Sequence, residues 1–144
     1  MIDAHTALRL HLLEPSDLRT LLGGPHVFWP ELPAGTSGNA KRVVFRGNGG
    51  SADNDLAIHR YTFNFRTYGA TSYEARQVYR ALHDRLVREG NVIVVDTFDS
   101  SRRVGFYNFT EVTPGQPLQD PPTGWFYFFS VWTVTVSTLA IPAA

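Results

Sequence analysis

The segment Leu56–Tyr68 reads LAIHRYTFNFRTY, and its residues alternate between apolar and polar side chains. The apolar positions are Tyr61, Phe63 and Phe65, and the polar positions are Arg60, Thr62, Asn64 and Arg66. A period of two is typical of a β-strand with one buried face and one face in contact with water. The segment therefore predicts the strand around which the fold is organised.

A helix is predicted directly after this strand, following a short break at Gly69 and Ala70. Thr71-Ser72-Tyr73-Glu74 has the pattern of a capping box, in which the Thr71 hydroxyl accepts from the Glu74 N–H and the Glu74 carboxylate accepts from the Thr71 N–H. Apolar residues then recur at helical spacing, at Ala75, Val78, Tyr79, Leu82 and Leu86. Gly90 is expected to end this helix as a left-handed cap.

The residues before the strand predict four short elements. Two are helices, two are extended segments, and their ranges are Ala4–Leu13, Asp17–Leu22, His26–Trp29 and Lys41–Arg46. Pro15 separates the helices, and Ser16 is the expected N-cap of the second. Lys41–Arg46 is predicted to pair antiparallel with Leu56–Tyr68, leaving Gly47–Asp55 (GNGGSADND) as a long exposed hairpin loop.

Three further strands are predicted after the helix, at Asn91–Phe98, Arg102–Val112 and Gly124–Thr138. The first is apolar on both faces, which is typical of a strand inside a sheet, and the second is its expected hairpin partner. The last is expected to be the longest strand of the sheet. Thr113–Thr123 contains four prolines and predicts a stiff, ordered loop. The order of elements predicts an α+β domain with helices packed on one face of a mainly antiparallel sheet.

Length and composition restrict the class of protein. A chain of 144 residues is expected to form one domain, spanning residues 1–144. Lys and Arg together number 13, as do Asp and Glu, so there is no basic excess of the kind that general nucleic-acid or anionic-membrane binding requires. The sequence has no Cys, which excludes a disulfide framework, a thiol nucleophile and thiolate-bound zinc.

No targeting or membrane segment is predicted. The N-terminus lacks the basic start and unbroken apolar run of a signal peptide. The most apolar run, Trp125–Val136, is too short for a membrane helix. We therefore expect a soluble, unprocessed chain.

Ordinary surface roles account for the motifs that superficially suggest catalysis or ligand binding. The five His residues show no zinc-ligand spacing, and the sequence contains no G-x-S-x-G elbow. Gly47–Ser51 resembles a phosphate-binding loop only superficially, because a strand and not a helix is predicted after it. Asp53-Asn54-Asp55 offers oxygen atoms for a divalent cation but lacks the spacing of an EF-hand. We expect no catalytic residue, no cofactor and no metal ion.

The sequence favours a protein–protein interaction surface over a catalytic or ligand-binding site. The polar side of Leu56–Tyr68 is either a solvated sheet face or a contact with another subunit. Aromatic residues on both sides of the final strand exceed what one small core needs, and such patches tend to mark interfaces. The candidate subunit-interface residues are Arg60, Arg66, Trp125, Tyr127 and Phe129.

The order of these motifs resembles the tail-terminator, or tail-completion, proteins of long-tailed bacteriophages. The segments that carry the resemblance extend over nearly the whole chain and are the helix ending at Leu21-Leu22-Gly23, Val27–Pro33, Val43–Phe45, Tyr61–Arg66, Tyr68–Leu86 and Tyr127–Val134. Gly47–Asp55 and Thr113–Thr123 match least.

The resemblance implies a structural, non-enzymatic virion protein. Such a subunit forms a homohexameric ring at the head-proximal end of the tail tube, stops tube polymerisation and offers a surface to the head connector. It would reside in the host cytoplasm before assembly, and its partners would be itself, the tail tube protein and the connector or neck proteins. The candidate axial contacts lie in the two least similar segments, at Asn48, Asp53, Asp55, Gln116 and Gln119.

Two alternatives remain open at the level of sequence. A neck or head–tail joining subunit is the nearest confusable role within the virion. A small α+β ligand-binding domain or enzyme, using a cleft between sheet and helices, is the alternative from a different class.

Overall fold

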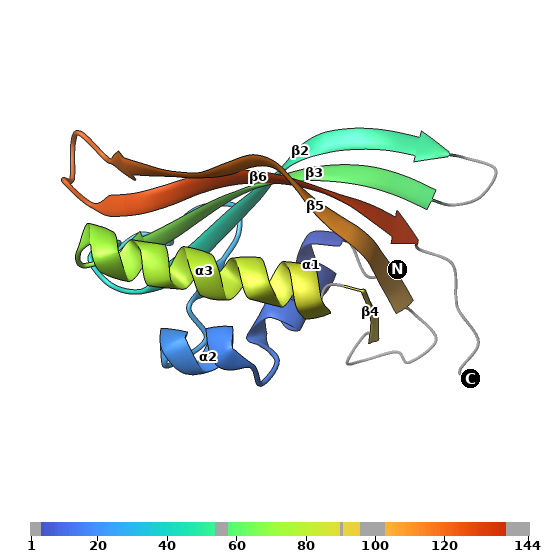
Figure 1. Cartoon of the computed structure of the whole chain (residues 1–144), viewed down its shortest axis with the longest axis horizontal. Coiled ribbons are helices and arrows are strands. Elements are labelled where there is room, and N and C mark those ends of the chain that lie inside the picture. The colour runs from blue at the N-terminus through green and yellow to red at the C-terminus, as the bar shows by residue number, and fades with distance from the viewer. Residues whose placement is uncertain (1–3, 54–57, 90, 96–102, 138–144) are drawn as a thin grey trace.

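A six-stranded sheet packs on three helices in the computed structural model, which describes residues 4–53, 58–89, 91–95 and 103–137 (Figure 1). The helices are α1 (Ala4–Leu13), α2 (Asp17–Leu22) and α3 (Ser72–Glu89). The strands are β1 (Val27–Phe28), β2 (Arg42–Asp53), β3 (Ile58–Gly69), β4 (Val92–Val95), β5 (Arg103–Gln119) and β6 (Phe126–Ser137).

The strand order is β1-β2-β3-β6-β5-β4, and every neighbouring pair is antiparallel except β1 and β2. The helices lie on one side of this strongly curled sheet (Figure 1). The predicted α+β class and mainly antiparallel sheet are confirmed.

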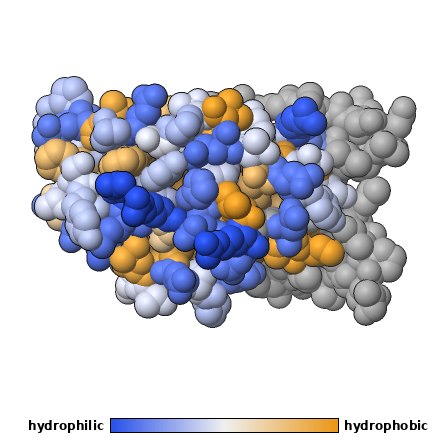
Figure 2. Space-filling model, viewed as in Figure 1, coloured by the Kyte–Doolittle hydropathy of each residue, from blue (hydrophilic) through white to orange (hydrophobic). Residues whose placement is uncertain are grey.

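The β3–α3 unit forms as the sequence predicts. Phe63 and Phe65 are fully buried, whereas Arg60 and Arg66 are exposed on the opposite face of the strand. β3 has β2 on one side and β6 on the other, so it is an interior strand that receives support from both neighbours. α3 lies across β3, β5 and β6, and its outward side is mostly hydrophilic, with apolar residues only in small separate patches (Figure 2).

The turn into α3 confirms half of the predicted capping box. The Thr71 Oγ1 accepts a hydrogen bond from the Glu74 N–H at 3.2 Å. The Glu74 carboxylate accepts from the Ala70 N–H at 2.9 Å, so the prediction that it binds the Thr71 N–H is wrong. The turn is tight at Gly69, where a Cβ would lie 2.3 Å from the Ala75 nitrogen. Gly90, the predicted C-cap, lies outside the described residues.

The N-terminal helices have the predicted bounds. The Ser16 Oγ accepts from the Arg19 N–H at 3.2 Å and caps α2, as the sequence indicates. Gly23 ends α2 with φ +70°, a backbone conformation that costs glycine little. Neither these helices nor α3 is long and apolar enough to cross a membrane, a finding that covers the described part of the chain.

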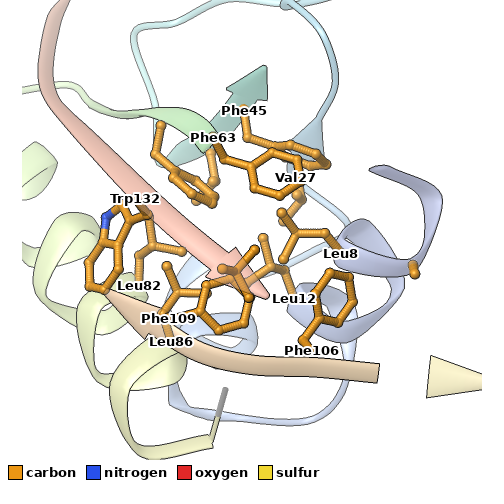
Figure 3. Packing of buried hydrophobic residues seen from close by; sticks show 14 of the residues in the cluster. Leu8, Leu12, Val27, Phe45, Phe63, Leu82, Leu86, Phe106, Phe109 and Trp132 are labelled. Atoms are coloured by element: carbon orange, nitrogen blue, oxygen red, sulfur yellow. The ribbon is translucent and has the colours of Figure 1, made fainter. Parts of the chain in front are cut away.

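The core lies between the helices and the sheet. Figure 3 shows how its aliphatic and aromatic side chains pack together: Leu8 and Leu12 from α1, Leu82 and Leu86 from α3, and Phe45, Phe63, Phe106, Phe109 and Trp132 from the sheet. Trp132 is the largest fully buried side chain. These residues fill the space between the two layers.

A buried polar cluster joins α1 to α3. Arg85 is only 5% exposed, and its guanidinium donates to the His11 carbonyl oxygen at 2.8 Å and to the Glu14 carboxylate at 3.2 Å. It also pairs with Glu89 one turn along α3. The ring Nδ1 of His11 lies 3.2 Å from the same guanidinium. Since a guanidinium can only donate, Nδ1 must accept, and the imidazole is neutral.

Two predicted loops are wrong, because their residues extend the neighbouring strands. The first is Gly47–Asp55: β2 continues through it to Asp53, pairing with β3 as far as Ile58, and the glycines are accommodated by a register shift between Gly47 and Gly50. A glycine-containing bulge lets a long strand twist without losing its partner. Asp55 lies outside the described residues.

The second wrong loop is Thr113–Thr123. β5 runs to Gln119, paired with β6, and only the residues around Asp120–Thr123 form a turn. Past β4, β5 has a neighbour on one side only, so Pro114 and Pro117 interrupt no second ladder. The Tyr79 hydroxyl accepts from the Gly115 N–H at 3.0 Å and satisfies one donor there. β5 is also longer than β6, which was expected to be the longest strand.

The position predicted for the strand after α3 is also wrong. β4 pairs with β5, as expected, but it forms the edge of the sheet and not its interior. Val94 is buried and Ile93 is 43% exposed, so only one side of this apolar run faces the core. The remaining predicted residues of this strand, 96–98, lie outside the described residues.

Candidate interaction surface on the open face of the sheet

One face of the sheet is not covered by any helix of the described structure, and we call it the open face (Figure 1). The strand residues of the core cluster, such as Phe45, Phe63 and Trp132, point to the helices, so the residues that alternate with them point to the open face. They are Val44 and Arg46 from β2, Arg60, Thr62, Asn64, Arg66 and Tyr68 from β3, and Tyr127, Phe129, Val131, Thr133 and Thr135 from β6.

Strand register determines which of these residues are neighbours. Arg66 lies between Val44 and Phe129, and the next residue beyond Phe129 is Gln116 of β5. Arg60 lies opposite Thr135, toward the other end of the sheet. Two of the predicted interface residues, Arg60 and Arg66, are therefore on the same face of the same strand but in different surroundings.

The aromatic residues gather around Arg66. Its guanidinium carbon lies 5.3 Å from the centre of the Tyr127 ring, a cation–π contact that holds the arginine against the sheet. Tyr68 contacts the same ring at 5.4 Å between centroids and meets Trp125 edge-to-face at 6.3 Å. Four of the five predicted interface residues, Arg66, Trp125, Tyr127 and Phe129, thus form or border a single cluster.

A pocket of about 260 Å³ lies over this cluster, and we call it the arginine pocket. The segment Pro30–Leu32 forms one wall. The sheet residues that line it are Val44, Phe45, Arg46, Asn64, Arg66, Tyr68, Trp125 and Phe129. The wall segment is held in place at its C-terminal side by close packing, since a Cβ at Gly38 would lie 2.5 Å from the Trp125 ring.

The open face is electrostatically positive in the part of the chain that the structure describes. Arg46, Arg60 and Arg66 are exposed, and none of them takes part in the ion pairs found among the described residues. The open-face residues named above include no Asp or Glu, and Glu31 reaches the arginine pocket only from the wall segment. Cations with apolar surface between them favour a partner that carries carboxylates.

Arg60 borders a second hollow of about 270 Å³ at the other end of the open face. Its lining is polar and comes from β3, β5 and β6, at Arg60, Asn108, Thr110, Thr133, Val134 and Thr135. Asn108 has φ +58° at a register shift of β5, and its N–H donates to the Asn91 side chain at 2.8 Å. The structure therefore does not bring Arg60 together with the other predicted interface residues.

The predicted axial contacts lie at two ends of the sheet, on strands and not in loops. Asn48 and Asp53 belong to the half of β2 that ends opposite Ile58. Gln116 and Gln119 are exposed on β5, next to Phe129 and Phe126 at the other end of β6. The Gln119 side chain donates to the Gly124 carbonyl oxygen at 3.1 Å and braces the turn there. Asp55 lies outside the described residues.

Sequence reasoning missed Arg46 and the wall segment Pro30–Leu32. Arg46 follows Phe45 on an alternating strand, so its outward position could have been predicted from the pattern. The wall could not, because nothing in its sequence indicates that it lies over β2 and β3. In the described ranges no three His, Asp or Glu side chains gather in a way that could hold a metal ion.

Comparison with protein-family models and with curated proteins finds no match for this chain. The features that bear on its function are therefore its own surface and the resemblance in the order of its motifs.

Proposed function

We propose that this chain is a structural subunit of a phage tail, a terminator that caps the head-proximal end of the tail tube as a homohexameric ring. It ends tube polymerisation and offers a docking surface to the head connector. Its partners are other copies of itself, the tail tube protein and the connector or neck proteins, and its final location is the virion. The role requires no catalysis and no cofactor.

The observation that carries the proposal is the cluster formed by Arg66 and the half-buried aromatic residues of the open face. Interface centres are enriched in Tyr, Trp, Phe and Arg and depleted in acidic residues. The open face has this composition, and exposed arginines with no ion pair within the described chain are suited to a contact between subunits.

The placement of the axial candidates supports the same role. Asn48 and Asp53 lie toward one end of the sheet, and Gln116 and Gln119 toward the other. A ring that stacks between two different partners needs contact surfaces at both of its ends. With the sheet roughly parallel to the ring axis, each pair would face one partner.

A second candidate function is favoured by the arginine pocket itself. A hollow of about 260 Å³ with two arginines on its rim could hold a small carboxylate-bearing ligand, as in a ligand-binding domain. The volume is just below the roughly 300–1,000 Å³ of typical small-molecule sites, so we favour the structural role.

The test is electron microscopy of particles made without this gene. A terminator predicts tails of uncontrolled length beside unattached filled heads. Uniform tails that fail to join heads would identify a neck or joining subunit instead, and normal infectious particles would refute a role in assembly.

Complementation with variants connects this test to the open face. Supplying Arg60→Glu/Arg66→Glu protein in place of the wild type should leave the deletion phenotype uncorrected. The matched control is Arg76→Glu/Arg80→Glu, which reverses two exposed arginines on α3 and should restore normal tails. Full correction by the open-face variant would remove this surface from the proposal.

A further inference from the structure

The arginine pocket has the size and chemistry to receive one apolar side chain accompanied by carboxylates. Val44 and Tyr68 form its floor and are only 5% and 6% exposed, while Trp125 and Phe129 are half-buried. Arg46 and Arg66 are exposed at its rim. An apolar floor with a cationic rim selects a group that is apolar at its centre and anionic at its flanks.

One segment of this sequence has that chemistry. Asp96-Thr97-Phe98-Asp99 places a carboxylate within two residues of Phe98 on each side, and no other aromatic residue of the sequence has an acid so close on both sides. The segment belongs to the connection between Val95 of β4 and Arg103 of β5. Each aspartate can pair with a rim guanidinium by charge-assisted hydrogen bonds.

We propose that the arginine pocket of one copy of this chain binds Asp96–Asp99 of a second copy. The inference rests on the proposed ring and identifies the two surfaces that would build it. Phe98 enters between Leu32 and Phe129, and Asp96 and Asp99 pair with Arg46 and Arg66.

The distances within one molecule exclude insertion into its own pocket. Ser137, which pairs with Gly105 of β5, lies eight positions after Phe129 on β6, or about 26 Å at roughly 3.3 Å per residue. β4 is two strands further from the pocket in the sheet order than β6 is. Phe98 is three residues from Val95, a reach of about 11 Å at most. A second copy must therefore supply the segment.

The geometry also fits a closed assembly. The pocket lies over β2, β3 and β6, whereas the segment follows in sequence on β4, the strand at the far edge of the sheet. Two different patches far apart on one molecule make a heterologous contact, which forms a ring when the rotation between copies closes. An isologous dimer would instead use the same patch twice.

The first experiment is cysteine cross-linking. Because the chain has no native Cys, only the introduced thiols can react. Glu31→Cys labels the pocket wall and Thr97→Cys labels the segment. A short bis-maleimide added to a millimolar mixture of these two variants should give a covalent dimer. The matched control replaces Glu31→Cys with Ser72→Cys, at the exposed start of α3, and should give at least tenfold less. Equal cross-linking of the two mixtures, or none, overturns the contact.

The second experiment exchanges charges. Arg46→Glu/Arg66→Glu and Asp96→Arg/Asp99→Arg should each reduce self-association at least tenfold, measured by analytical ultracentrifugation at high concentration. Mixing the two variants should restore it, because each then offers the charge that the other lacks. Failure of the mixture to recover would refute the pairing, and circular dichroism of each variant verifies that it has folded.

The cross-linking experiment and the gene deletion test the contact and the proposed function separately. Over-long tails in the gene deletion, without the Glu31–Thr97 cross-link, would retain the terminator and refute this contact. Over-long tails without the cross-link are the result expected if the pocket binds a segment of the tail tube protein instead. Specific cross-linking together with normal particles in the deletion would keep the self-association and refute the terminator.

Discussion

Acid is expected to destabilise this fold through one buried histidine. Burial of His11 and the nearby Arg85 guanidinium lower its pKa from 6.5 to about 4, because both disfavour the imidazolium form. The unfolded chain takes up the proton near pH 6.5, whereas the folded chain keeps His11 neutral down to about pH 4. The unfolded state therefore binds more protons within this window, and stability falls as the pH falls through it.

The magnitude follows from the size of the pKa shift. The difference of about 2.5 units between 6.5 and about 4 corresponds to roughly 3.4 kcal/mol at 1.36 kcal/mol per unit. About 2 kcal/mol of this is lost between pH 7 and pH 5, and about 1 kcal/mol more by pH 4. For a domain of this size, about 2 kcal/mol is a large part of the free energy of unfolding.

The assay is urea unfolding of the wild type and of His11→Gln at pH 7 and pH 5. Glutamine has no proton to take up at the imidazole position, so the variant should lose about 2 kcal/mol less than the wild type over this interval. His59→Gln, on β3, is the matched control and should behave as the wild type does. Equal losses for the wild type and His11→Gln would refute the argument that burial holds His11 neutral.

Three local substitutions test other parts of the fold. Gly69→Ala should destabilise it by about 1–3 kcal/mol in urea unfolding, because the new Cβ would lie 2.3 Å from the Ala75 nitrogen. Ser16→Ala should cost about 1 kcal/mol through the lost cap of α2, and Ser16→Asp should largely retain stability. Tyr79→Phe should cost about 1–2 kcal/mol and speed hydrogen exchange of the Gly115 amide, whereas unchanged exchange would show that another acceptor replaces the hydroxyl.

Local chemistry explains which elements could be predicted from the sequence. The alternation in β3, the Ser16 cap and the helical spacing of α3 are all determined by residues close in the chain. These local patterns agree with the tertiary packing, since Phe63 and Leu82 lie in the core on the sides that the periodicity indicates. The fold class followed from these elements.

The extents of β2 and β5 depend on partners distant in sequence. Gly47–Asp53 and Pro114–Gln119 have the composition of loops, and nothing in their own sequences favours a strand. They become strands because β3 and β6 offer long, well-formed ladders beside them, and register shifts absorb the residues that fit poorly. The edge position of β4 was unpredictable for the same reason, since an apolar tetrapeptide does not indicate how many neighbours it has.

The candidate site also depends partly on local sequence signals and partly on contacts between segments distant in the sequence. Alternation in β3 predicted that Arg60 and Arg66 are on the outward face, and the aromatic run predicted Tyr127 and Phe129 as interface residues. In the structure these two aromatic residues lie beside Arg66 and not beside Arg60. The arginine pocket also requires Pro30–Leu32 to lie over β2, a contact between segments that share no periodicity. Sequence therefore predicted the face, and only the three-dimensional arrangement located the hollow.

The charge distribution of the open face argues against a face-to-face dimer. Two copies meeting through this face would bring Arg46, Arg60 and Arg66 of each against the same arginines of the other, and none of the open-face residues named above carries a carboxylate. A contact between the arginine pocket of one copy and an acidic segment of another would be attractive instead of repulsive. Such segments exist because the net charge of the chain is zero, so its carboxylates balance its arginines and lysines. The two arrangements respond oppositely to salt, since screening weakens attraction and repulsion alike. Sedimentation of the wild type should therefore show association that weakens from about 50 mM to about 500 mM NaCl, and association that strengthens over this range would favour the face-to-face dimer.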